Sequence, residues 1–109
     1  KVEVLHAHCA DVGRDPAATM PIAGGSVIVT DDASRVEARM KAIGDLNRVP
    51  PERRQAAFHG NPDQVAARIA AFHRAGARGY ILGMPSPHDR EIVTRFATEV
   101  IPRVKRLVA

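Results

Sequence analysis

The chain has 109 residues, which is enough for one domain with a modest core. Its 16 basic and 12 acidic residues are scattered rather than clustered, so we expect no nucleic-acid partner. Aromatic residues make up only 4%, which also disfavours a base-stacking surface. No apolar run approaches the ~20 residues of a membrane span, and the single Cys9 excludes an internal disulfide. These features predict a cytoplasmic protein with no membrane partner.

The first half of the chain is predicted to contain a helix, a strand and a second helix. Residues 1–12 repeat apolar side chains at helical spacing, and Gly13 follows them as a stop signal. The segment Ile22–Thr30 is rich in β-branched residues and is predicted to be a strand. Asp31 or Asp32 can cap the helix that follows. The predicted buried face of that helix consists of Val36, Met40 and Ile43.

Residues 59–84 are predicted to form a helix, a tight turn and a strand. Asn61 is a good N-cap, and Gln64 stands where a capping box needs its second member. Gly76 is expected to end the helix in the left-handed conformation. The following GYILGM is apolar without alternation, which predicts a parallel strand buried on both faces. The side chains expected to share a core are Ile69, Phe72, Ile81, Leu82, Phe96 and Val100.

The remaining segments complete an alternation of helices and strands. A short helix is predicted over Pro51–Phe58, leading into a brief extended AFHG. Ser86 is predicted to cap the last helix, with Asp89 as its capping-box partner. Pro102 should bend that helix because it lacks a backbone N–H. Its expected apolar stripe is Ile92, Val93, Phe96, Val100, Val104 and Leu107.

Strands that alternate with helices predict parallel βα units and an α/β fold. About three strands cannot close a barrel, which needs eight. The chain is therefore expected to be either an open sheet or the last third of a larger fold. Because it lacks an initiator Met and opens within a helical pattern, we expect a fragment.

Three stretches resemble the C-terminal part of the luciferase-like monooxygenases. They read HCADVGRDPA, HGNPDQVAARIAAFHRAGARGYIL and FATEVIPRV, and the likeness extends from Leu5 to Leu107. The most specific is the G-x-P-x-x-V-A-x-R-I pattern from Gly60 to Ile69; family members often read GTPEEVAERI there. Asn61 stands where Thr is usual, which is a conservative change of helix cap.

The resemblance implies that residues 1–109 are a single-domain fragment, the C-terminal part of a (β/α)8 TIM barrel. Ile22–Thr30, AFHG and GYILGM would then be its sixth, seventh and eighth strands. It further implies an oxidoreductase or monooxygenase that uses reduced FMN or a reduced deazaflavin (coenzyme F420) on a small organic substrate, often as a homodimer. The HCADVGRDPA stretch is closer to the deazaflavin branch. The N-terminal two thirds, which carry most flavin contacts in this family, are absent, so this segment alone is not expected to catalyse the reaction.

Ligands of TIM barrels lie at the C-terminal ends of the strands, and the loops after strands seven and eight often receive a phosphate. Both loops here lead into helix N-termini, whose N–H groups attract anions. The residues expected to bind the cofactor or substrate are His59, Gly60, Asn61, Gly83, Met84 and Ser86. The alternative is that Asn61 and Ser86 only cap helices and that His59 fills space. No catalytic residue is identified, and no His, Cys or carboxylate cluster indicates a metal site.

Two other classes of protein stay open. One is a non-catalytic α/β binding or dimerisation module built from the same βα units. The other is a small open-sheet protein of flavodoxin-like shape, which should begin with a strand and carry about five strands. Since three strands cannot cover GYILGM on both faces, we expect the segment to pair with another copy or to belong to a longer chain.

Overall fold

The computed structural model describes residues 1–46, 48–53, 58–84 and 89–109. It is a mixed α/β structure, as the sequence predicts. Its five α-helices and three strands, in chain order, are α1 (Val2–Asp11), β1 (Ile22–Val29), α2 (Ala33–Leu46), β2 (Phe58–Gly60), α3 (Pro62–Arg74), β3 (Gly79–Gly83), α4 (Arg90–Arg95) and α5 (Ile101–Val108). Among the described residues, no helix combines the length and apolar character that crossing a bilayer requires.

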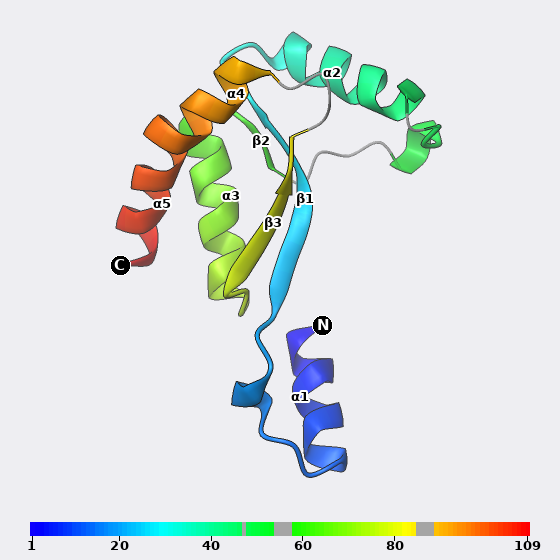
Figure 1. Ribbon diagram of the computed structural model, residues 1–109, viewed down its shortest axis with the longest axis vertical. Helices are drawn as coiled ribbons and strands as arrows, with labels where there is room; N and C mark the ends of the chain where they lie inside the picture. Colours follow the sequence, from blue (N-terminus) through cyan, green and yellow to red (C-terminus); the bar gives the residue numbers. More distant parts are fainter. Residues whose placement is uncertain (47, 54–57, 85–88) are drawn as a thin grey trace.

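The three strands form an open parallel sheet in the order β2-β1-β3 (Figure 1). In a closed barrel, consecutive strands are neighbours, so a seventh strand would lie between the sixth and the eighth. Here β1 is central instead. The three residues of β2 pair with Val27–Val29, in the C-terminal half of β1. Strand β3 pairs with Ile22–Ser26, on the other edge of β1. The described residues therefore form an open sheet and no barrel.

One face of the sheet carries the core. Helix α3 lies against this face and α5 packs on α3 (Figure 1). Phe58 of β2 is fully buried, and its ring lies 5.3 Å from that of Phe72 and 6.3 Å, edge-on, from that of Tyr80. The Tyr80 hydroxyl donates to the carbonyl of Ile69 at 3.1 Å, and burial raises the pKa of this phenol. The aromatic cluster thus joins β2, β3 and α3.

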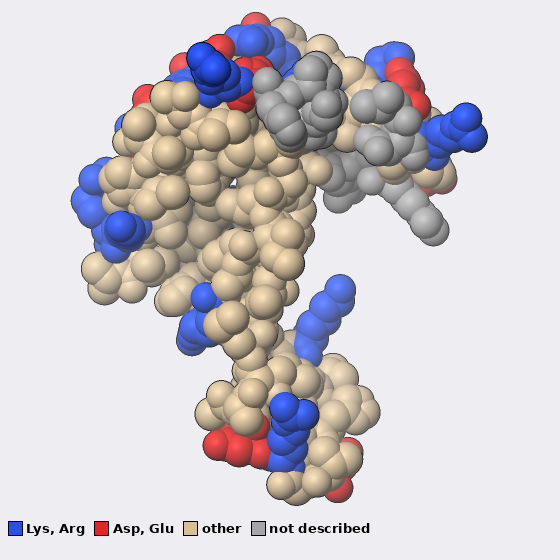
Figure 2. All heavy atoms as spheres, viewed as in Figure 1, with Lys and Arg blue, Asp and Glu red and all other residues tan. Residues whose placement is uncertain are grey.

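The expectation that GYILGM is buried on both faces is wrong. Ile81 is 70% exposed, whereas Tyr80 and Leu82 are half-buried on the α3 side. Successive side chains of a strand point to opposite faces, and no described element covers Ile81 on the second face. Figure 2 shows that the surface over the middle of β1 and β3 carries no charged side chain. Of the expected core, Ile69 and Val100 are buried, and Phe72, Leu82 and Phe96 are partly buried against the core.

The predicted caps of the central helix are present. Asn61 Oδ1 accepts from Gln64 N, and Gln64 Oε1 accepts from Asn61 N, both at 2.9 Å, which completes the capping box. Gly76 has φ +110° and Gly13 has φ +67°. Of the two candidate caps for α2, Asp32 accepts from the Ser34 amide at 2.9 Å. Its hydrogen bonds with Ser34 lower the pKa of the Asp32 carboxyl.

The ends of two other predicted helices differ. The cap of α4 is Asp89, which accepts from Glu91 N and Ile92 N. Ser86, the predicted cap, lies outside the described residues. Pro51–Arg53 forms a single 3-10 turn, and residues 54–57 of the helix predicted there are not described.

The last helix contains a wide turn where the proline interrupts its hydrogen bonding. A π-helical turn over Phe96–Val100 comes directly before Pro102, which has no N–H to donate. The expected stripe is only partly buried: Ile92 and Val100 lie in the core, but Val93 and Leu107 are exposed. The inward positions advance by four residues through the wide turn, from Ile92 to Phe96, Val100 and Val104, and all four belong to the expected stripe. Only Val93 and Leu107 were wrongly assigned to it.

Replacing Gly76 by Ala is expected to destabilise the chain by roughly 1 kcal/mol, because alanine resists the left-handed region. The new Cβ would also lie 3.1 Å from Cγ2 of Val2. Urea unfolding measures the change. An unchanged free energy of unfolding would contradict the left-handed assignment.

Phe58→Ala is expected to cost about 3–5 kcal/mol, because it opens a cavity among fully buried side chains. The control is Ile81→Ala on the neighbouring strand, which should change stability by less than about 0.5 kcal/mol because the side chain is exposed. Equal losses in the two variants would mean that the second face of the sheet is covered in solution.

Candidate functional site

A cleft lies at the C-terminal ends of β1 and β2, where α2 crosses the end of the sheet (Figure 1). Its volume is about 620 Å³, within the range of small-molecule sites. Ligands of parallel α/β folds bind at this edge of the sheet. The residues that line it are Thr30, Asp31, Ala33, Val36, Glu37, Met40, His59, Gly60, Asn61 and Gln64.

The lining combines an apolar wall with acidic groups. Helix α2 supplies the apolar wall through Ala33, Val36 and Met40. Among the described lining residues, the charged side chains are the carboxylates of Asp31 and Glu37, and none of these residues is a Lys or an Arg. His59 is exposed at the end of β2. This arrangement suits an apolar or hydrogen-bonding group better than an anion.

The N-terminus of α3 is poorly suited to an anion. Pro62 has no N–H, and the Gln64 and Val65 amides donate to the side chain and carbonyl of Asn61. Asp63 adds a negative charge in the same turn. The Asn61 side chain therefore caps the helix, and the amides of Gln64 and Val65 are already hydrogen-bonded.

The structure brings only part of the predicted site together. His59, Gly60 and Asn61 line the cleft. Gly83 and Met84 are not among its lining residues, because β3 pairs with the opposite edge of β1 from β2 and Gly83 lies beside Ser26. Met84 packs partly against the core. Ser86 lies outside the described residues, so its predicted role stays a prediction.

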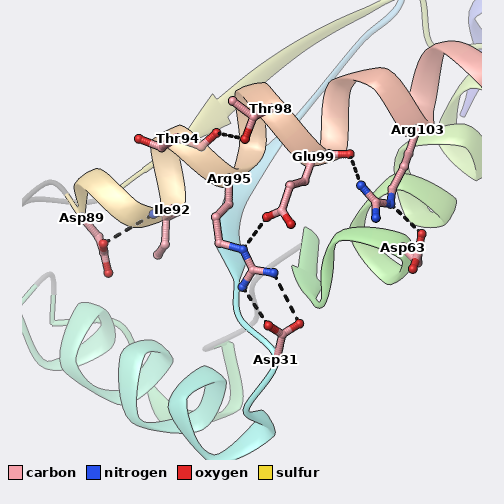
Figure 3. Close-up of polar contacts among 9 residues, drawn as sticks. All are labelled: Asp31, Asp63, Asp89, Ile92, Thr94, Arg95, Thr98, Glu99 and Arg103. Atoms are coloured by element: carbon pink, nitrogen blue, oxygen red, sulfur yellow. Dashed lines mark hydrogen bonds and ion pairs between the residues drawn. The ribbon is translucent and has the colours of Figure 1, made fainter.

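Two arginines behind the cleft were not singled out from the sequence (Figure 3). Arg95 Nη1 lies 3.1 Å from Asp31 Oδ2, and Arg95 Nε donates to Glu99. The hydrogen bonds with Glu99 and Asp31 raise the pKa of the Arg95 guanidinium further above its ordinary value. Arg103 Nε donates to Asp63 at 2.7 Å. Since these pairs join positions 64 and 40 residues apart, no local pattern could have indicated them.

Among the residues that the structure describes, no three His, Cys, Asp or Glu side chains gather as a metal site would require.

The backbone conformation and the position of the Gln64 side chain both require glycine at position 60. Gly60 has φ +122°, and a Cβ there would collide with Gln64 Oε1, the acceptor of the capping box. The Gln64 side chain lies directly over Gly60, and both residues line the cleft.

The chain was compared with protein-family models, with curated proteins and with solved structures, and none of them matches it.

Gly60→Ala is expected to destabilise the chain by about 1–2 kcal/mol, since it adds left-handed strain and displaces the Gln64 side chain. The same substitution made in a Gln64→Ala background should cost less, because the collision is then gone. Thermal or urea unfolding of the four proteins gives both differences. Equal costs in the two backgrounds would show that the capping box does not depend on this glycine.

Proposed function

We propose that the chain supplies the C-terminal βα units of a luciferase-like (β/α)8 barrel, an oxidoreductase that uses reduced FMN or a reduced deazaflavin on a small organic substrate. In the closed barrel β2 would lie between β1 and β3, an order that the three-stranded sheet described above does not have. The observation that carries this proposal is the cleft at the carboxyl ends of two parallel strands, lined by His59, Gly60 and Asn61. The G-x-P-x-x-V-A-x-R-I pattern begins within this lining and continues into the capped helix α3. Motif and ligand-sized cleft thus coincide.

The cleft residues do not fit the phosphate of a flavin cofactor. Asp31 and Glu37 are negative, the part of the lining that the structure describes holds no Lys or Arg, and the amides of Gln64 and Val65 are engaged. We therefore assign this cleft to the organic substrate or to the uncharged ring of the cofactor. His59 would donate or accept a hydrogen bond there, and Met40 and Val36 would contact the apolar part of the ligand.

A second candidate is a non-catalytic dimerisation module. It would use the uncovered face of the sheet, where Ile22 is 53% and Ile81 70% exposed, as the contact between two copies. Large apolar side chains grouped on one face are typical of protein interfaces. On this hypothesis the homodimer forms without any flavin.

The test is a titration of the purified chain with FMN and with a deazaflavin, followed by fluorescence. On the proposed function we expect binding that His59→Ala weakens about 5-fold, the loss of one hydrogen bond worth about 1 kcal/mol. The matched control is His6→Ala on α1, an exposed histidine outside the cleft, which should bind as the parent chain does.

Sedimentation of the same samples separates the hypotheses. A stable dimer that binds neither cofactor supports the dimerisation module. A well-folded monomer with affinity for neither cofactor contradicts both the barrel assignment and the oxidoreductase function that depends on it.

A further inference from the structure

The last helical segment, from α4 to α5, contacts the loop after β1 and the first turn of α3, both of which border the cleft (Figure 3). Asp31 belongs to the loop after β1, and the guanidinium of Arg95 binds both of its carboxylate oxygens, at 3.1 and 3.4 Å. Asp63 lies two residues after the cleft residue Asn61, and Arg103 binds it at 2.7 Å. One helical segment therefore reaches a loop and a helix start that follow different strands.

Both arginines also meet at Glu99, which lies midway between them. Arg95 Nε donates to the Glu99 carboxylate, whereas Arg103 Nη1 donates to the Glu99 main-chain carbonyl at 2.7 Å. The three residues are spaced by four along the segment that contains the π-helical turn, so they share one side of it. In Figure 3 the Arg95 side chain points toward Asp31 and that of Arg103 toward Asp63, whereas Thr94 and Thr98 lie away from both aspartates.

These ion pairs differ from ordinary surface ion pairs in the burial of the arginines and in the number of hydrogen bonds that each arginine makes. The Arg95 and Arg103 side chains are 20% and 32% exposed, whereas their partners Asp31 and Asp63 are 71% and 81% exposed, so the pairs are buried on the arginine side only. A guanidinium that binds two oxygens of one carboxylate is held in a defined orientation, and each arginine has a second acceptor besides its aspartate. A single exposed pair would contribute little, but a connected row can fix the positions of its partners.

We propose that Arg95 and Arg103 are positioning residues of the cleft: from behind, they hold the β1–α2 loop and the first turn of α3 at a fixed separation. Deeper in the sheet, the ends of β1 and β2 that lead into these two segments are joined by the hydrogen bond from Thr30 N to Gly60 O at 2.9 Å. Beyond that bond, the arginine row (Arg95 and Arg103, joined through Glu99) sets the distance between the two walls of the cleft. The inference concerns the cleft of the proposed function and rests on that function only for the identity of the ligand.

The two arginines bind different groups of Glu99, so one substitution can separate their contributions. Glu99→Gln removes the charge that Arg95 binds but keeps the carbonyl that Arg103 binds. The substitution should therefore loosen the loop at Asp31 and leave the turn at Asp63 unchanged. Arg103→Gln should do the reverse.

The experiment is amide hydrogen exchange of the full chain by NMR. In Arg95→Gln, amides of residues 31–37 are expected to exchange about 10-fold faster, as local opening becomes easier. In Arg103→Gln the same should occur over residues 62–66. Arg106→Gln, an exposed arginine on the same helix, is the matched control and should change neither segment. The ring signals of His59 should shift in the first two variants and not in the control.

Further variants separate positioning from general stability. Asp31→Asn should reproduce Arg95→Gln, and the double variant should add little, because the two residues act as a pair. Arg95→Lys should restore part of the protection. If Arg95→Gln fails to fold, Asp31→Asn tests the same contact from its exposed side.

Two results would overturn the proposal. One is unchanged exchange over residues 31–37 in both Arg95→Gln and Asp31→Asn. The other is an equal increase over the whole chain, Tyr80 and Val27 included, which would indicate a purely global effect. A parent chain that binds no flavin contradicts the proposed function instead, and it leaves this exchange pattern as it is.

Discussion

Strand β1 is the constraint on which the rest of the structure depends, because it is the one described strand with a neighbour on each edge. Its C-terminal half is buried: Val27, Ile28 and Val29 are each at most 2% exposed. Its N-terminal half pairs with β3 but is covered on one face only. Both β2 and β3 join the sheet through β1, so a change in β1 alters the cleft and the open face together. Burial of apolar surface along its second half supplies the main stabilisation of this arrangement.

Local features of the fold could be predicted, because their causes lie within a few residues. The capping box of Asn61 and Gln64 and the left-handed Gly76 each depend on neighbouring backbone groups, and both are confirmed. The exposure of Ile81 could not be predicted in this way. An apolar run without alternation indicates burial on both faces only if other elements cover both faces, and that is decided far away in the chain. The order β2-β1-β3 is likewise set by strand lengths and tertiary contacts.

The candidate site was predictable to the same extent. His59 and Gly60 line the cleft because a strand end and a capped helix meet there, which the sequence indicates. Gly83 and Met84 do not, because the strand order places them at the other edge of β1. The described lining is acidic and apolar, and the cap that marks the start of α3 engages the Gln64 amide, so this helix end is less suited to an anion than the sequence suggests. A good N-cap and a good phosphate site are therefore partly exclusive at the same helix end.

Under either functional hypothesis, another part of a barrel or a second copy would cover the open face of the sheet. The radius of gyration is 16.0 Å, compared with about 13 Å for a compact domain of this length, and Figure 1 shows α1 extending away from the other helices. Met20, Ile22 and Ile81 are all more than half exposed, and β3 carries neither a charge nor a proline to protect its edge. Further barrel strands would cover this surface, and so would a second copy. The face therefore does not distinguish an oxidoreductase from a dimerisation module. The cleft does, because only the first hypothesis gives His59 and the arginine row behind it a ligand to position.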